Sequence, residues 1–433
     1  MRPPGRTRRI PLCLAAACLA VPGVAAAPVT AGPPAGLARQ YHVAGARTVA
    51  DADAVARTGA AVDSIEHGQL YVSATPAEVR AIRRLGLTVA PLAPPAPAEV
   101  GAKAAGDFPS NMAKYHTYAE MNQAIDQLVA AHPALMSRGT LGRSHEGRDI
   151  PLIKISRNAG ADEAEPEVLV TAHHHAREHL TVEMALYLMR ELVTGYGADA
   201  RITKILDSRE IWVVPDVNPD GGEYDISGDR LKMWRKTRQP NGNGTFGTDP
   251  NRNYGHKWGC CGGSSGSPSS DTYRGTAAFS STEVDRVRDF VDSRVVNGKQ
   301  QIRANLDWHS YSELILWPYG YTHNAVEPGL TADDAATFQA WGKKMAATNG
   351  YTPKQASGLY VTDGSSLDWL WFAHKIFGFT FEMYPKGSSP GFYPPDSVID
   401  KETSRNREAS LLLFETADCP YRLIGKGDQY CGG

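Results

Sequence analysis

Four histidines, a glutamate and an arginine lie within seven consecutive residues, from His173 to His179. Imidazole nitrogens and carboxylate oxygens are ligands that zinc takes in catalytic sites, where three protein ligands leave a fourth position open. One interpretation pairs His175 with Glu178 as a His-x-x-Glu motif and expects a third ligand far downstream. The residue types therefore indicate metal chemistry, provided that the fold supplies that third ligand.

Two other interpretations of the same residues remain open at this point. His175, Glu178 and His179 form His-x-x-Glu-His, the inverzincin protease signature, in which both histidines bind zinc and the glutamate is the base. A histidine-rich turn can also be a solvated loop that chelates metal incidentally. Because short motifs have many chance matches, the rest of the chain has to decide.

A buried strand and a helix are predicted to flank this cluster. Residues 167–172 form a short apolar run rich in β-branched side chains, which is typical of a buried strand. Apolar residues then recur every four positions, as on one face of a helix: Leu180, Met184, Leu188 and Leu192. The cluster thus lies where a strand ends and a helix begins, which is where open α/β sheets build their sites.

The composition is that of a soluble globular protein. The chain has 433 residues, a hydrophobic fraction of 42%, a charged fraction of 21% and a formal net charge of −2. This length is sufficient for two domains. A net charge so near zero gives no reason to expect nucleic acid or an acidic membrane surface as a partner. We expect a monomer that binds neither.

The first 26 residues have the pattern of a secretory signal peptide. Several arginines precede an apolar run from Ile10 to about Ala26, and Val24 with Ala26 fits the −3 and −1 positions of a signal-peptidase site. This run is too short to anchor the chain, and no later apolar run is long enough to span a bilayer. We therefore expect a secreted, extracellular protein.

Four cysteines remain once the predicted signal peptide is removed: Cys260, Cys261, Cys419 and Cys431. An even number in a secreted chain indicates two disulfides, with three possible connectivities. We favour a Cys419–Cys431 bond, which closes a short C-terminal loop, together with a vicinal Cys260–Cys261 bond. Zinc ligation by these cysteines is disfavoured because neither pair has Cys-x-x-Cys spacing.

Residues 27–106 are expected to form a small α+β propeptide followed by a linker. Segments 39–43, 69–72 and 87–90 are strand-like, and Pro76–Leu85 reads as a helix with proline at its first position. Residues 91–105 are dominated by proline and alanine, as in an exposed linker. A compact unit between a signal peptide and a linker suggests a propeptide, and an ordinary accessory domain is the alternative.

Residues 107–417 are expected to form the catalytic domain, and residues 418–433 a C-terminal tail. Strand-like and helical segments alternate, which predicts an α/β fold. Within it, Asn218–Gly221 reads as a turn, 241–270 as a long loop and Asp400–Thr416 as the last helix.

Four predicted strands end in polar residues that are capable of chemistry: His175 with Glu178, then Asp216, His309 and Glu382. The carboxyl ends of strands meet at one edge of an α/β sheet, so these side chains are expected to converge. Two histidines and a glutamate would make a catalytic zinc centre with one open position for water. Glu382 would then be free to act as the base.

These residues resemble the motifs of zinc metallocarboxypeptidases of the carboxypeptidase A type, close to secreted bacterial members. The matching motifs follow in order between about Asp107 and Thr416: His175–Glu178, Trp234–Arg238, Asn251–Asn253, His309–Tyr311, Leu359–Tyr360 and Phe379–Glu382. The resemblance implies a mixed twisted sheet flanked by helices, preceded by the family's activation propeptide. One departure is His179, where the family often has tryptophan, and this departure produces the apparent inverzincin match.

The resemblance also implies a role for each matched residue. His175, Glu178 and His309 would hold one zinc ion, and Glu382 would be the general base. The others would stabilise the oxyanion (Arg235), bind the C-terminal carboxylate of the substrate (Asn251 and Arg252), close over the substrate (Tyr360), line an outer subsite (Arg177) and floor the pocket for the C-terminal side chain (Leu367).

The main hypothesis is a secreted zinc exopeptidase that removes the C-terminal residue of peptides and proteins, made as a zymogen and cut by an activating protease. Because Leu367 is uncharged, hydrophobic C-terminal side chains are expected to be preferred. Asp363 in the same segment offers a way to admit basic residues as well. A zinc endopeptidase of His-x-x-Glu-His type and an inactive binding relative are the alternatives. The sequence identifies no calcium site, so whether the protein binds a structural calcium ion is left open.

Overall fold

The computed structural model describes Met1 and residues 38–66, 68–92 and 106–432. The predicted signal peptide, residues 1–26, lies outside the described residues apart from Met1, and so does most of the predicted linker, residues 93–105. The chain divides into Met1–Ala35 and Gly36–Gly433, and all the helices and strands of the described ranges lie in the second unit. None of the helices in these ranges is long and apolar enough to cross a membrane.

Residues 39–91 form a four-stranded antiparallel sheet, in the order β2-β3-β1-β4, with two helices. The elements are β1 (Arg39–Ala44), α1 (Val49–Ala56), β2 (Ala61–Glu66), β3 (Gln69–Ala74), α2 (Pro76–Arg84) and β4 (Thr88–Pro91). Each helix is preceded by a threonine, Thr48 or Thr75, that forms a capping box with an acidic residue three positions later. The sequence did not predict β2, because Asp63 and Ser64 interrupt its apolar pattern.

Eight strands form one mixed sheet in the residues from 106 onward, in the order β13-β12-β14-β11-β7-β8-β6-β5. The central strands β14, β11, β7 and β8 run parallel to one another, whereas β12, β6 and β5 run antiparallel to a neighbour. The strands are β5 (Met136–Arg143), β6 (Asp149–Ile155), β7 (Glu167–Ala172), β8 (Glu210–Val214), β11 (Ile302–Ser310), β12 (Leu314–Trp317), β13 (Thr352–Gln355) and β14 (Phe377–Met383), with a separate pair β9 (Val295–Val296) and β10 (Lys299–Gln300). The predicted α/β class with a mixed sheet is confirmed.

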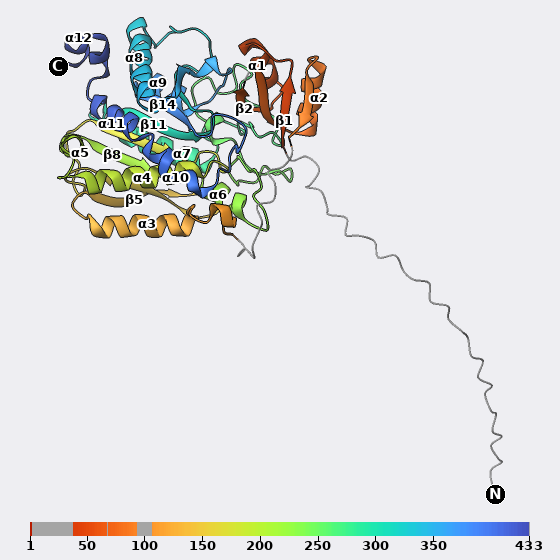
Figure 1. Cartoon of the computed structure of the whole chain (residues 1–433), viewed down its shortest axis with the longest axis horizontal. Helices are drawn as coiled ribbons and strands as arrows, with labels where there is room; N and C mark the ends of the chain where they lie inside the picture. Colours follow the sequence, from red (N-terminus) through yellow and green to blue (C-terminus); the bar gives the residue numbers. More distant parts are fainter. Residues whose placement is uncertain (2–37, 67, 93–105, 433) are drawn as a thin grey trace. The chain divides into compact units, whose positions relative to one another are not determined.

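Helices cover both faces of this sheet. Buried residues of α4 and α11 pack on one face, and those of α7 and α9 pack on the other. Figure 1 shows α3 beside β5 at one edge, and α8 packs against β12 and β13 at the opposite edge. The α-helices are α3 (Tyr118–Ala131), α4 (Leu180–Gly195), α5 (Ala200–Leu206), α6 (Pro219–Ile226), α7 (Thr282–Ser293), α8 (Ala332–Asn349), α9 (Ser366–His374), α10 (Ile399–Ser404), α11 (Arg407–Thr416) and α12 (Gly427–Cys431).

The central strand β11 alternates between an apolar and a polar face. Ala304, Leu306 and Trp308 belong to the core beneath α4 and α11. The residues between them point to the opposite face, because successive side chains of a strand alternate. Asp307 therefore shares a face with His309, and its carboxylate accepts a hydrogen bond from Thr171 of β7 at 2.8 Å. The backbone period of two thus carries polar side chains toward the carboxyl edge of the sheet.

Several elements differ from the sequence-based prediction. Residues 218–221 are not an isolated turn: Asn218 caps α6, with Pro219 at its first position. The predicted last helix is divided into α10 and α11, and α12 follows it. At the break, the Asn406 amide donates to the Tyr351 hydroxyl at 3.1 Å, a contact that local sequence does not reveal. The two disulfides, Cys260–Cys261 and Cys419–Cys431, are paired as favoured from the sequence.

Candidate active site and metal centre

One pocket is lined by His175, Glu178, His309 and Glu382 at the carboxyl end of the parallel strands. His175 and Glu178 lie in the loop after β7, while His309 and Glu382 lie near the ends of β11 and β14. The register of these two strands places His309 directly beside Glu382. The predicted convergence is thus observed for three strand ends. It is wrong for Asp216, which does not line this pocket and instead contacts the His173 ring at 2.9 Å.

Three donor groups approach one another as closely as a metal site requires. The Nδ1 atoms of His175 and His309 are 3.1 Å apart. Glu178 Oε1 is 2.8 Å from His175 Nδ1, and its Oε2 is 3.1 Å from His309 Nδ1. Tetrahedral zinc with bonds of about 2.0–2.1 Å separates its ligand atoms by about 3.3 Å, which is close to these distances. These three residues form one of the groups of the described chain that can hold a metal ion.

Two buried aspartates orient the histidines of this group. Asp249 Oδ1 lies 3.2 Å from His175 Nε2, and Asp307 Oδ2 lies 3.0 Å from His309 Nε2. A carboxylate that accepts the Nε2 proton leaves the Nδ1 lone pair free as a ligand. Two such lone pairs at 3.1 Å repel each other unless a cation lies between them. The donor set therefore fits zinc.

The electrostatics of the group also favour a positive charge. Although burial lowers the pKa of His309, the carboxylates of Asp307 and Glu178 raise that pKa well above its usual range. Neither Asp307 nor Asp249 was singled out from the sequence. Asp307 had a detectable signal, because a residue two positions before His309 in a strand must share its face. Asp249 lies in an irregular segment and had none.

His179 lies outside this donor group. Its Nε2 atom is 2.9 Å from Oδ2 of Asp225 in α6. The same carboxylate accepts a hydrogen bond from the Tyr393 hydroxyl at 2.8 Å, and its other oxygen accepts one from the Trp234 N–H at 2.7 Å. The His179 ring therefore belongs to a buried network beside the pocket, which disfavours the His-x-x-Glu-His interpretation.

Glu382 and Arg235 face the metal group from two other elements. Burial raises the pKa of Glu382 to about 8, a direction that suits a carboxylate which must take up a proton. Arg235 lies in the segment after α6 and is 7% exposed. Its Nε and one terminal nitrogen each lie 3.0 Å from Asp249 Oδ2. Although burial lowers the pKa of Arg235, Asp249 keeps that pKa above its usual range, so the group remains a cation.

Arg252, Asn251 and Tyr360 line the same pocket. The Arg252 guanidinium donates to the Tyr360 hydroxyl at 3.0 Å, to the Gly263 carbonyl at 3.1 Å and to the Asn251 carbonyl at 2.6 Å. Among the residues that the structure describes, no carboxylate forms an ion pair with Arg252. Its positive charge is thus oriented by neutral oxygens and is left available for an anionic ligand.

Leu367 lines the pocket together with four other uncharged residues, Leu316, Leu359, Thr362 and Thr380. Asp363, the residue considered for binding basic side chains, does not line it. Its carboxylate is fully buried and accepts hydrogen bonds from the Cys261 N–H and the Gly263 N–H at 3.1 and 3.0 Å, and from the Ser264 hydroxyl. The geometry gives Asp363 no contact with the pocket floor.

Arg177 does not line the pocket and is bound to the N-terminal sheet instead. Its guanidinium pairs with Asp63 Oδ1 at 2.9 Å and Asp271 Oδ2 at 3.2 Å, and it donates to the Ser73 hydroxyl at 3.0 Å. Asp63 and Val62 of β2 in turn line the pocket beside the metal group. Residues 39–91 therefore contact the candidate active site directly.

A second group of acidic residues lies elsewhere in the described chain. Asp162, Glu167 and Glu210 bring carboxylate oxygens together. Arg294 pairs with Asp162 and Glu167, and Lys154 Nζ is 2.6 Å from Glu210. These two side chains supply the positive charge that the carboxylates need, so this group gives no support for calcium.

The family model described as zinc carboxypeptidase matches residues 121–409 of this chain. The chain belongs to the zinc carboxypeptidase family. It is 45% identical over 384 residues to a zinc carboxypeptidase from Saccharothrix mutabilis subsp. capreolus, covering 86% of this chain and 87% of that one. It is also 37% identical over 318 residues to carboxypeptidase A2 of Rattus norvegicus, covering 73% of each. The chain is accordingly a zinc metallocarboxypeptidase, as the sequence motifs predicted.

Solved structures agree on the fold of this zinc carboxypeptidase. Carboxypeptidase A from Helicoverpa armigera superposes with a TM-score of 0.70 at 23% identity, covering 89% of this chain and 98% of that one. Thrombin-activatable fibrinolysis inhibitor gives a TM-score of 0.68 at 24% identity, covering 88% and 99%. Each match covers more of this chain than residues 107–433 alone can supply, so the matched region extends into the residues before 107.

Proposed function

We propose that this zinc carboxypeptidase is a secreted exopeptidase, held latent by its N-terminal residues, that removes hydrophobic residues from the C-terminus of peptides and proteins. The proposal is supported by one observation: the same pocket is lined by His175, Glu178 and His309, by Glu382 and by Arg252. The metal group and Glu382 can cleave a peptide bond, and Arg252 can bind a free carboxylate.

His175, Glu178 and His309 would hold the zinc ion through the converging atoms described above. When bound there, zinc supplies a Lewis acid that activates water and polarises the carbonyl of the scissile bond. Asp249 and Asp307 keep the Nε2 protons of the two histidines in place and thereby direct their Nδ1 lone pairs into the site.

Glu382 accepts the proton that the attacking water must lose and delivers it to the nitrogen of the leaving amine. Its raised pKa supports this role, because a carboxylate with a higher pKa is a stronger base and takes a proton from water more readily. Arg235 donates hydrogen bonds to the carbonyl oxygen as negative charge develops on it. A well-placed donor of this kind lowers the barrier by about 3–4 kcal/mol.

Arg252 and Asn251 bind the C-terminal carboxylate of the substrate. A planar guanidinium matches a carboxylate with two parallel hydrogen bonds, which an ammonium group does not provide. Tyr360 already contacts the Arg252 guanidinium, so its hydroxyl lies where it closes over a bound C-terminus. A fixed cation in the same pocket as the catalytic groups is typical of an exopeptidase. Once the C-terminal carboxylate is bound to it, only the last peptide bond of the substrate lies at the metal site.

Hydrophobic side chains at the C-terminus suit the apolar floor. Leu367 and Leu316 are nearly fully buried and carry no charge. Burying an unpaired lysine or arginine against them is costly. Asp363 does not relieve this cost, because its carboxylate is bonded to the turn at 261–264.

The N-terminal sheet maintains latency by occupying the approach to the site. The Asp63–Arg177 ion pair is nearly inaccessible to solvent and lies beside the metal group, a location that supports a blocking role for β2. Removal of residues 27–106 by an activating protease exposes Arg177, which then lines an outer subsite for the substrate. An N-terminal sequence of the secreted active enzyme that begins near residue 27 is incompatible with this proposal.

Paired peptide substrates test the proposed activity. A peptide with a free C-terminal phenylalanine should be hydrolysed, whereas its C-terminal amide should not be, because the amide lacks the charge that Arg252 recognises. The same peptide ending in arginine should give a lower kcat/KM. Cleavage of the amide at an internal bond would instead indicate an endopeptidase, and no cleavage of any peptide after removal of the N-terminal residues would indicate an inactive relative.

A further inference from the structure

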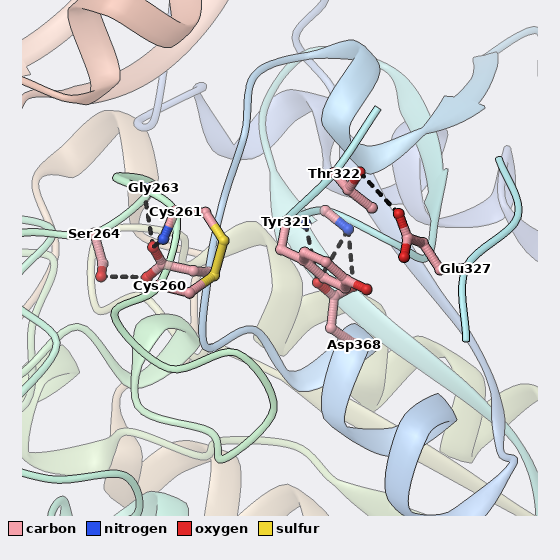
Figure 2. Close-up of a disulfide and its surroundings, with 10 residues drawn as sticks. Cys260, Cys261, Gly263, Ser264, Tyr321, Thr322, Glu327 and Asp368 are labelled. Carbon is pink, nitrogen blue, oxygen red and sulfur yellow. Dashed lines mark hydrogen bonds between the residues drawn. A yellow bond between two sulfur atoms is a disulfide. The ribbon is translucent and has the colours of Figure 1, made fainter. Parts of the chain in front are cut away.

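The vicinal disulfide Cys260–Cys261 begins a turn that connects two parts of the substrate-binding pocket. Figure 2 shows this disulfide beside Gly263 and Ser264. The turn packs against residues 361–363, which follow Tyr360. A Cβ atom at Gly263 would lie 2.4 Å from the Thr362 Cα, so only glycine permits this approach.

Asp363 organises this turn through three hydrogen bonds. Its Oδ2 accepts from the Cys261 N–H at 3.1 Å and from the Gly263 N–H at 3.0 Å, and its Oδ1 accepts from the Ser264 hydroxyl. The carboxylate is fully buried, and in the described part of the chain no lysine or arginine forms an ion pair with it. The donors of residues 261–264 therefore stabilise the negative charge of Asp363, and their hydrogen bonds to this carboxylate hold the turn in its conformation.

Gly263 transmits this order to Arg252. Its N–H donates to Asp363, and its carbonyl accepts from the Arg252 Nε at 3.1 Å. The Nε bond fixes the plane of the guanidinium, because all the nitrogens of that group are coplanar. A displaced Gly263 would thus rotate the guanidinium away from the position that meets a substrate carboxylate in two parallel hydrogen bonds.

The disulfide restricts the same turn from its other end. It closes a small ring that contains the peptide bond between Cys260 and Cys261, and the N–H of this peptide is one of the donors to Asp363. Fewer backbone conformations are then available to the turn, which lowers the entropy lost when it is ordered.

We propose that Asp363 is a positioning residue, which, with the Cys260–Cys261 disulfide, holds Arg252 in the orientation that binds the C-terminal carboxylate of the substrate. The proposal rests on the carboxylate-binding role of Arg252 given above. It assigns to this pair of cysteines and to Asp363 an effect on substrate affinity, and none on the chemistry at the metal group.

Two substitutions at position 363 separate positioning from charge. Asp363→Ala leaves the Cys261 and Gly263 N–H groups without their acceptor. It should raise KM for a peptide ending in phenylalanine by at least about tenfold, the loss expected when the substrate carboxylate loses one hydrogen bond to the charged Arg252 group. Asp363→Asn retains one oxygen for both N–H groups, and its amide can donate to Ser264. It should keep KM close to the wild-type value. Both variants should keep kcat.

Cysteine variants provide the matched comparison. Cys260→Ser combined with Cys261→Ser should raise KM in the same direction, whereas Cys419→Ser combined with Cys431→Ser removes a disulfide that does not contact the pocket and should leave KM unchanged. If the alanine variant at position 363 does not fold, the first cysteine pair gives the answer. Unchanged KM in that pair, or equal effects of alanine and asparagine at position 363, would overturn the proposal.

A double substitution shows whether the effect passes through Arg252. In an Arg252→Ala background, Asp363→Ala should cause no further increase in KM, because the group that it positions is absent. An increase of the same size in both backgrounds would mean that Asp363 acts on the pocket by another route, and the inference would be wrong. Arg252→Ala alone reports on the proposed function separately: if it leaves KM unchanged, the carboxylate-binding assignment itself fails.

Discussion

Asp249 is the residue whose substitution tests most of the site at once. Its Oδ1 accepts from His175 Nε2 at 3.2 Å and from the Asn251 N–H at 3.0 Å, and its Oδ2 accepts from Arg235 through two nitrogens at 3.0 Å. The side chain is fully buried. An Asp249→Asn substitution keeps the volume of the side chain and replaces one of these oxygens with an amide donor.

Both orientations of the new amide are unfavourable. If its NH2 group faces Arg235, two hydrogen bonds to a charged group are lost, and a buried cation is left without its partner, at a cost of about 3–5 kcal/mol. If the NH2 group faces His175, it also faces the Asn251 N–H, which then loses its acceptor. The histidine must accept at Nε2 and carry its proton on Nδ1, the atom that should bind zinc. The second orientation is the less costly, and loss of such a carboxylate weakens zinc binding about 10–100-fold.

We therefore expect Asp249→Asn to raise the zinc dissociation constant by that factor, measured by competition with a chelator. At saturating zinc, kcat should remain below wild type, because Arg235 has lost its counter-charge. Asp307→Asn is the matched control: it should weaken zinc binding similarly through His309, with kcat restored at saturating zinc. Wild-type zinc affinity in Asp249→Asn, or full recovery of its kcat, would refute this reasoning.

Three further predictions have separate readouts. Glu382→Gln should keep zinc and substrate binding and lose a factor of about 10²–10⁴ in kcat, and a loss below tenfold would exclude Glu382 as the base. His179→Ala should retain zinc by metal analysis while His309→Ala loses it, and the reverse result would support the inverzincin interpretation. Burial raises the pKa of Asp368 to about 7, whereas an aspartate in the unfolded chain has a pKa of about 3.9. The folded state therefore binds this proton more tightly than the unfolded state does. As a result, the free energy of unfolding falls by at most about 4 kcal/mol as the pH rises from about 4 to about 7. Asp368→Asn should flatten this dependence in urea unfolding at pH 5 and 8, and an unchanged slope would assign it to other groups.

The central sheet and its helices were predictable because their signals are local. The run at 167–172 and the four-residue spacing after Leu180 each describe one element completely. The parallel order of the strands then follows from the alternation of strands and helices, and it brings the strand ends together. His175, His309 and Glu382 were proposed as site residues in this way, since each lies at or shortly after the end of an apolar run.

Elements that depend on distant partners were not predictable. The strand β5 contains glycines, arginines and a serine, and it forms only because β6 pairs with it. The four-residue strand β12 is stabilised between β13 and β14. Asp249 had no signal for the same reason, because its role is defined by side chains 14 and 74 residues away. Spacing rules describe neighbours along the chain and contain no information on such contacts.

His179 shows that spacing along the sequence alone does not identify a metal ligand. Along the sequence it is as good a ligand as His309, because it directly follows Glu178. In space its imidazole is bound by Asp225, a residue 46 positions later that α6 carries beneath the loop. The same carboxylate accepts the N–H of Trp234, so the group that binds His179 also binds the segment that contains Arg235. The network around Asp225 therefore favours the interpretation in which His309, and not His179, completes the donor group.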